Sequence, residues 1–261
     1  MLALEAYQYL LISLIFIWSG FVRAGLGFGG AALSLPFILL VDNRPIVYLP
    51  IIAIHLLFFS SLTVAQGYLK RRKTGTDDQQ SMGGVDWTFL KYALSIMIVP
   101  KLIGVMGLIT LPDKIMSIII FSVVIAYSLC YVFNKTLKSS NKTVDTLFLI
   151  LGGYVSGTSL IGAPLITAVF ANKVSKFKLR DTLFALWFIL VSIKMAAYIY
   201  ADVSFHWLDQ LWLLPAVFIG HIAGLRFHDR LLHTDPKVFY RVLGVVLLVV
   251  SIVGLWMALH G

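Results

Sequence analysis

Three basic residues stand inside long apolar stretches of this sequence: Arg23, Lys101 and Lys194. No acidic residue stands at a similar depth in those stretches. A charge held in an apolar phase costs about 2.5–3.5 kcal/mol on membrane-insertion scales, so it calls for a counter-charge. The pattern predicts that a bound anion supplies it. The alternative is that the side chains extend along their helices to the water boundary, although the reach from mid-stretch is poor.

Two glycine-rich segments suggest a second kind of anion chemistry. The first reads GFVRAGLGFGGA from Gly20 to Ala31, and the second reads GYVSGTSLIGAP from Gly153 to Pro164. Glycine lets a backbone turn and approach a ligand closely. A helix that restarts after such a turn presents free N–H groups and the positive end of its dipole.

These restarts are expected near Ala31 and near Pro164, because proline suits the first turn of a helix. The candidate anion-binding residues in the two segments are Gly27, Gly29, Gly30, Gly162 and Ala163 through their backbone, and Thr158 and Ser159 through their hydroxyls. The alternative role is tight helix packing through small residues, and the two roles can coexist.

Two histidines, His55 and His221, also lie within apolar stretches. They are candidates for a proton relay coupled to transport, or for hydrogen-bonded packing residues. No carboxylate or thiol stands at ligand spacing from them, so no metal site is predicted. No cofactor is predicted either. Cys130 is the only cysteine, which excludes an intrachain disulfide.

The composition indicates where these residues lie. Of the 261 residues, 59% are apolar and 13% are charged, whereas soluble domains are about 45–50% apolar and about 25% charged. The excess apolar surface must face lipid. Because no hydrophilic stretch is long enough for a second core, one membrane domain is expected over residues 1–261.

A membrane-spanning helix needs roughly 20 apolar residues. Plain candidates are about Ile46–Leu69, Trp87–Leu111, Ile115–Phe133, Thr182–Ala201, Trp207–Leu225 and Val238–His260. Two further stretches, Tyr7–Val41 and Val144–Asn172, are each interrupted by one of the glycine-rich segments. We expect an all-α polytopic membrane protein in which each interrupted stretch is a hairpin or a kinked helix.

The two interrupted stretches align with each other. At an offset of 133 positions, Gly20 meets Gly153, Val22 meets Val155, Gly29 meets Gly162 and Phe37 meets Phe170. The offset is close to half the chain, which predicts two structural repeats, about 1–134 and 135–261, each with three spanning helices besides its interrupted stretch.

The net charge of +9 lies mainly in four short clusters. The clusters are Lys70–Lys73; Lys135, Lys138 and Lys142; Lys173, Lys176, Lys178 and Arg180; and Arg226, Arg230, Lys237 and Arg241. If both interrupted stretches are hairpins, all four clusters fall on the cytoplasmic side, as the positive-inside rule requires. The repeats are then inverted, and the hairpin tips meet near the midplane. Kinked crossings would give eight helices in two parallel repeats.

The basic residues do not alternate with aromatic residues along one face, so nucleic-acid binding is not expected.

The glycine-rich segment before Pro36 and its counterpart ending at Pro164, half a chain apart, resemble those of the TauE/SafE family of membrane permeases. Glycines near the ends of two later apolar stretches add to the resemblance, namely Gly104, Gly107, Gly220 and Gly224. The resemblance implies transport of small sulfur-containing anions such as sulfite, sulfoacetate and related sulfonates. It also implies a bacterial inner membrane or an equivalent plasma membrane. The sequence departs from the family pattern at Thr158–Leu160, where the family carries more glycine.

The function expected is therefore that of a multi-pass secondary transporter of a small anion, which binds between the two glycine-rich breaks. No P-loop pattern is present, so an ion or substrate gradient would supply the energy. The alternatives are a membrane-embedded enzyme and a non-transporting membrane subunit. The sequence leaves open the anion, the direction of transport, the coupling ion and whether the chain forms a homo-oligomer.

Overall fold

The computed structural model describes residues 4–26, 30–74, 84–133, 141–231 and 237–260, and this part of the chain is all helical. Its helices in chain order are α1 (Ala6–Leu26), α2 (Gly30–Val41), α3 (Pro45–Thr74), α4 (Trp87–Thr110), α5 (Asp113–Val132), α6 (Lys142–Ser159), α7 (Ala163–Lys173), α8 (Lys176–Tyr200), α9 (Trp207–Leu231) and α10 (Lys237–His260).

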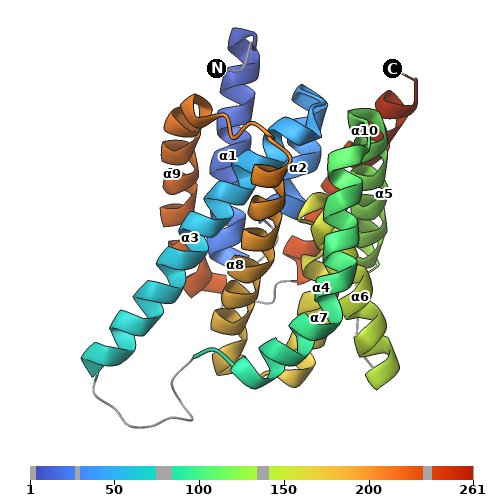
Figure 1. Ribbon diagram of the computed structural model, residues 1–261. Helices are drawn as coiled ribbons and strands as arrows, with labels where there is room; N and C mark the ends of the chain where they lie inside the picture. The colour runs from blue at the N-terminus through green and yellow to red at the C-terminus, as the bar shows by residue number, and fades with distance from the viewer. Residues whose placement is uncertain (1–3, 27–29, 75–83, 134–140, 232–236, 261) are drawn as a thin grey trace.

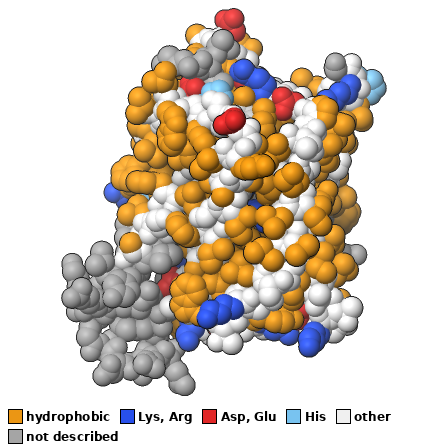
Figure 2. All heavy atoms as spheres, viewed as in Figure 1, with side chains coloured by type: hydrophobic (Ala, Val, Ile, Leu, Met, Phe, Trp, Pro, Cys, Tyr) orange, Lys and Arg blue, Asp and Glu red, His pale blue; other side chains and the backbone are white. Residues whose placement is uncertain are grey.

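Seven helices of the described chain are long and apolar enough to cross a membrane: α1, α3, α4, α5, α8, α9 and α10. Lipid cannot form hydrogen bonds with the backbone, whereas a helix pairs its own N–H and C=O groups. An apolar segment that crosses a membrane is therefore helical. Large apolar side chains stay exposed along these helices, as on α4, where Val99 is 61% and Ile103 is 59% exposed. In Figure 2 they cover much of the surface between the two ends of the bundle. The prediction of an all-α polytopic membrane protein is confirmed.

Two helices are too short to cross. α2 has 12 residues and α7 has 11, which gives lengths of about 18 and 17 Å against a hydrocarbon core of about 30 Å. Each folds back beside the helix before it. Gln8 Nε2 of α1 donates to the Val41 oxygen at the end of α2 over 3.0 Å. Lys173 Nζ at the end of α7 lies 3.0 Å from Asp145 Oδ2 in α6. Both interrupted stretches are therefore hairpins.

The two hairpins enter the bundle from opposite ends. In Figure 1, α1 begins and α2 ends at the upper end, whereas α6 begins and α7 ends at the lower end. After each hairpin, three long helices alternate in direction, so that both termini lie at the upper end. Lys142, Lys173 and Lys176 thus share the lower end, and Lys114 at the start of α5 lies at the upper end. Lys135 and Lys138 lie outside the described residues.

The long arm of each hairpin packs closely against one other helix: α1 packs against α9, and α6 packs against α4. The contacts use glycine. A Cβ added to Gly224 of α9 would meet Phe21, Ala24 and Gly25 of α1, and a Cβ added to Gly104 of α4 would meet Tyr154, Gly157 and Thr158 of α6.

The two sets of partners correspond residue by residue. The partners of Gly104 lie 133 positions after those of Gly224, in the same order. In the same way, a Cβ added to Gly20 of α1 would contact Val217 of α9, and a Cβ added to Gly153 of α6 would contact Met97 of α4. This correspondence favours two inverted repeats, and the repeat boundaries stay a prediction.

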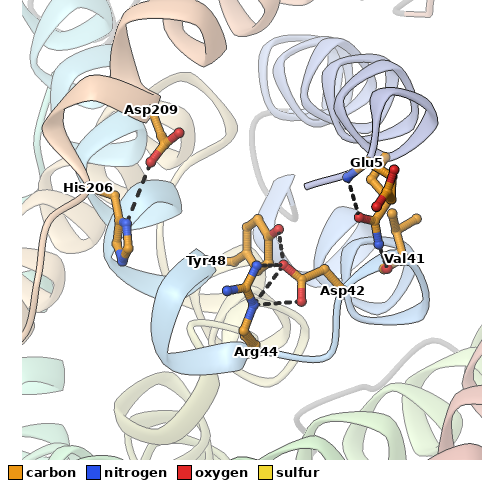
Figure 3. A network of polar contacts seen from close by, with 8 residues as sticks. Glu5, Val41, Asp42, Arg44, Tyr48, His206 and Asp209 are labelled. Atoms are coloured by element: carbon orange, nitrogen blue, oxygen red, sulfur yellow. Dashed lines mark hydrogen bonds and ion pairs between the residues drawn. The ribbon is translucent and has the colours of Figure 1, made fainter. Parts of the chain in front are cut away.

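A polar network holds the upper end of the first hairpin (Figure 3). Arg44 Nε lies 2.7 Å from Asp42 Oδ1, and the Tyr48 hydroxyl donates to Asp42 Oδ2 over 2.6 Å. The hydrogen bonds and charge of Asp42 raise the pKa of Arg44, with partial burial acting against this. The ion pair with Asp42 compensates the charge of Arg44.

The glycine contacts predict a sharp difference between two neighbouring positions of α4. Gly104→Ala should destabilise the protein by about 1–3 kcal/mol, the usual cost of overpacking, because the added Cβ would lie 3.1 Å from Gly157 Cα. Gly107→Ala is the matched control, since its nearest neighbour would be Leu111 Cδ1 at 4.0 Å. The melting temperatures of the purified proteins in detergent measure both effects. Equal melting temperatures would show that α4 and α6 do not pack through Gly104.

The hairpin arrangement also predicts sidedness. In a Cys130→Ala background, single cysteines at Lys142 and Lys176 should react with an impermeant maleimide from the cytoplasmic side, and a cysteine at Lys114 from the opposite side. All three side chains are exposed. Reaction of positions 142 and 176 from opposite sides would contradict the α6–α7 hairpin.

Candidate functional site

The tip of the first hairpin holds a buried guanidinium. Arg23 lies in the last turn of α1 and is 6% exposed. Its Nη1 donates to the His55 backbone oxygen of α3 over 3.2 Å. Its Cζ lies 4.1 Å from the centre of the Phe59 ring, a cation–π contact. Its Nη2 is buried and has no hydrogen-bond partner among the described residues.

A small cavity adjoins this guanidinium. Its lining residues come from α1, α2 and α3 and are Phe16, Ser19, Arg23, Gly30, Ile52, His55 and Leu56. The Ser19 hydroxyl donates to the Gly30 oxygen over 3.3 Å, and the single proton of the Ser34 hydroxyl is donated either to that oxygen or to the Ser19 hydroxyl 3.2 Å away. The cavity therefore combines a cationic group and the hydroxyl of Ser19 with apolar walls.

Gly30 allows the close approach of the two arms. A Cβ at this position would lie 3.0 Å from Arg23 Cβ and 3.1 Å from the Ser19 oxygen. Gly27 and Gly29, which the sequence analysis also placed in the site, lie outside the described residues.

Both histidines predicted as relay candidates lie near Arg23. The His55 ring packs edge-on against Phe16, with centroids 5.4 Å apart, and the His221 ring lies 4.8 Å from the Phe59 ring. Neither ring forms a hydrogen bond through Nδ1 or Nε2 within the described chain, although Gln210 lies near His55. The structure thus brings Arg23, Gly30 and the two histidines together.

The tip of the second hairpin is more tightly closed. The hydroxyls of Thr158 and Ser159 donate to the Val155 oxygen within α6, over 3.1 and 3.0 Å. A Cβ added to Gly162 would lie 2.9 Å from Ser156 Cβ, so this glycine packs α7 onto α6. Ala163 begins α7 and is buried. In this arrangement the two hydroxyls bond to their own helix.

Lys101 and Lys194 meet at this second tip rather than at Arg23. Lys101 Nζ donates to the Ser156 oxygen and hydroxyl, both over 2.9 Å, and Lys194 Nζ donates to the Thr158 oxygen over 3.2 Å. Both side chains are fully buried. The predicted site residues therefore fall into two clusters, one at each hairpin tip.

Sequence reasoning missed the aromatic and hydroxyl partners of these cations. The Phe59 ring makes the cation–π contact with the Arg23 guanidinium, and Ser19 and Phe16 line the cavity beside that guanidinium. One signal was available, because positions 16, 19 and 23 share one helical face at spacings of three and four. Nothing in the local sequence marks Phe59.

The profile of the family described as sulfite exporter TauE/SafE matches residues 12–254 of the chain. The chain belongs to the TauE/SafE family. This is a family of membrane permeases, so the protein is a multi-pass membrane transporter, as the resemblance predicted. No curated protein and no solved structure matched the chain. In this TauE/SafE protein the match extends over both hairpins and all seven long helices.

The Arg23 cluster predicts different roles for two adjacent phenylalanines. Phe59→Leu should lower the stability by about 1–2 kcal/mol, because a desolvated cation–π contact and the ring contact with His221 are lost. Phe58→Leu is the comparison, since Phe58 is 49% exposed and loses only its edge-on contact with the Phe59 ring, whereas Phe59 is 0% exposed. Thermal melts in detergent should show a drop of several degrees for Phe59→Leu and a clearly smaller one for Phe58→Leu. A Phe59→Leu protein that melts with the parent would argue against this contact.

Proposed function

We propose that the protein is a secondary transporter of a small oxyanion of the sulfite or organosulfonate class, and that the anion binds beside Arg23 at the tip of the α1–α2 hairpin. The family supports transport of such anions. The observation that carries the site is the buried Arg23 guanidinium, whose Nη2 has no acceptor within the described chain.

Among the residues that the structure describes, the charge of Arg23 has no partner of opposite sign, because no ion pair there involves Arg23. A buried cation without a counter-ion is costly, and the cost is relieved when an anion enters. Charged residues inside membrane spans characteristically mark the pathway of the transported ion.

The chemistry of the cavity fits an oxyanion. A guanidinium is planar and offers paired N–H groups to two oxygens of a sulfonate or sulfite. The Ser19 hydroxyl lines the same cavity, and Gly30 starts α2 with the positive end of its dipole. Because water is scarce there, each of these contacts is stronger than it would be at a surface.

The remaining predicted features belong to the same proposal. His55 and His221 flank the guanidinium cluster and can exchange a proton, which would couple anion movement to a proton gradient. The halves 1–134 and 135–261 would act as inverted repeats that expose the site alternately to the two sides. The membrane would be the bacterial inner membrane or an equivalent plasma membrane.

Flux of radiolabelled sulfite into proteoliposomes tests the proposal. Arg23→Gln should reduce the flux by about ten- to a hundredfold, since hydrogen bonds to a charged group contribute about 1.5–3 kcal/mol. Arg23→Lys should reduce it less, because a point charge replaces the planar fork. Arg226→Gln, a change at an exposed arginine of α9, is the control and should transport at the parental rate. Size-exclusion chromatography checks folding. A folded Arg23→Gln protein with parental flux would remove the site from this hairpin tip.

A further inference from the structure

Two lysines from different helices converge on the last turn of α6. Lys101 comes from α4 and Lys194 from α8, and both are 0% exposed. Their ammonium groups donate to backbone oxygens only two residues apart, those of Ser156 and Thr158. Both groups thus lie at the same turn of α6, where like charges repel each other. Two like charges held together in a buried place need an explanation.

The protein does not use all the donors of these groups. Each ammonium carries three N–H donors. Lys101 has two acceptors, the oxygen and the hydroxyl of Ser156, and Lys194 has one, the Thr158 oxygen. Half of the N–H donors of the pair are thus without an acceptor in the part of the chain that the structure describes. No carboxylate there pairs with either lysine.

The end of α6 compensates only part of the charge. A helix C-terminus carries roughly half a negative charge, whereas the ammonium pair carries two positive charges when both groups are protonated. The hydroxyls of Thr158 and Ser159 donate to Val155 and add no negative charge. Leu160 ends the helix in the left-handed region, with φ 61°, a conformation that a leucine adopts at a cost of about 1–2 kcal/mol. A positive excess remains at this tip.

The packing correspondence relates this tip to the Arg23 cluster. Gly104 of α4 and Gly224 of α9 make equivalent contacts with the two hairpins. Lys101 lies three residues before Gly104, and His221 lies three residues before Gly224, so Lys101 corresponds to His221. Ser156 of α6 corresponds to Arg23 of α1, 133 positions earlier. The first tip therefore has its cation on the hairpin itself, whereas the second has Lys101 on the partner helix α4, together with Lys194 of α8.

We propose that Lys101 and Lys194 hold a second oxyanion at the tip of the α6–α7 hairpin, separate from the Arg23 site. This inference rests on the proposed function, since it concerns the same class of anion. The anion accepts the remaining N–H groups of both lysines and neutralises their mutual repulsion. A transporter with one cationic station at each hairpin tip passes the anion between two sites rather than holding it at one.

Equilibrium dialysis of the purified protein in detergent against radiolabelled sulfite tests this, because it counts bound anions per chain. The parent should bind two. Lys101→Met and Lys194→Met should each lose one, with the affinity of that site reduced at least about tenfold. Arg23→Gln should lose the other. Lys91→Met removes an exposed lysine from the same helix as Lys101 and should keep both.

The outcomes separate the two proposals. A parent that binds one sulfite, lost in Arg23→Gln and kept in Lys101→Met, overturns the second site and leaves the first. A parent that binds one sulfite, lost in the lysine variants and kept in Arg23→Gln, overturns the two-site arrangement and the Arg23 site. If a methionine variant fails to fold, Lys194→Gln keeps an N–H donor for the Thr158 oxygen and removes the charge. Full binding by folded Lys194→Gln would also overturn the second site.

Discussion

The structure depends on one constraint: a polar group inside a bilayer must find its partner within the protein. Continuous helices meet this constraint along their length, and the difficulty arises where a helix ends at depth. Here two helices, α1 and α6, end inside the bundle and turn back as hairpins. In the described part of the chain, the cations that lie deep in the bundle gather at these two ends. Arg23 binds the His55 oxygen beside the first, and two lysines bind the carbonyls of the second.

Close packing of the hairpin arms follows from the same constraint. Lipid offers no hydrophobic gain for bringing helices together, so they associate through close contact of small residues and through buried polar groups. The glycines at positions 20, 104, 153 and 224 bring backbones together along two long helix pairs. This rigid packing fixes the depth of each hairpin tip relative to its partner helix. The cations at the tips are thereby held where the chain cannot neutralise them fully.

Much of this arrangement could be predicted from the sequence. Hydrophobic length identified the long helices, and the glycine interruptions located both hairpin tips within a few residues. The grouping of the site residues could not be predicted, because it depends on which helices pack together. Lys101 and Arg23 look alike in the sequence, yet α4 packs on α6 while α1 packs on α9. Phe59 was missed for the same reason, since an aromatic residue in an apolar helix carries no mark of its contact with Arg23.

The two hairpins are fastened at their open ends by different chemistry. An uncharged amide of Gln8 joins the arms of the first, and an ion pair between Asp145 and Lys173 joins the arms of the second. Lys173 is 45% exposed on its side chain, so dissolved salt and the negative charge of lipid headgroups reach this pair and weaken it. The hydrogen bond of the Gln8 amide joins two uncharged groups, so neither salt nor headgroup charge weakens it in this way. The contact between the two arms of the second hairpin therefore depends on the ionic surroundings, whereas the Gln8 contact between the arms of the first does not.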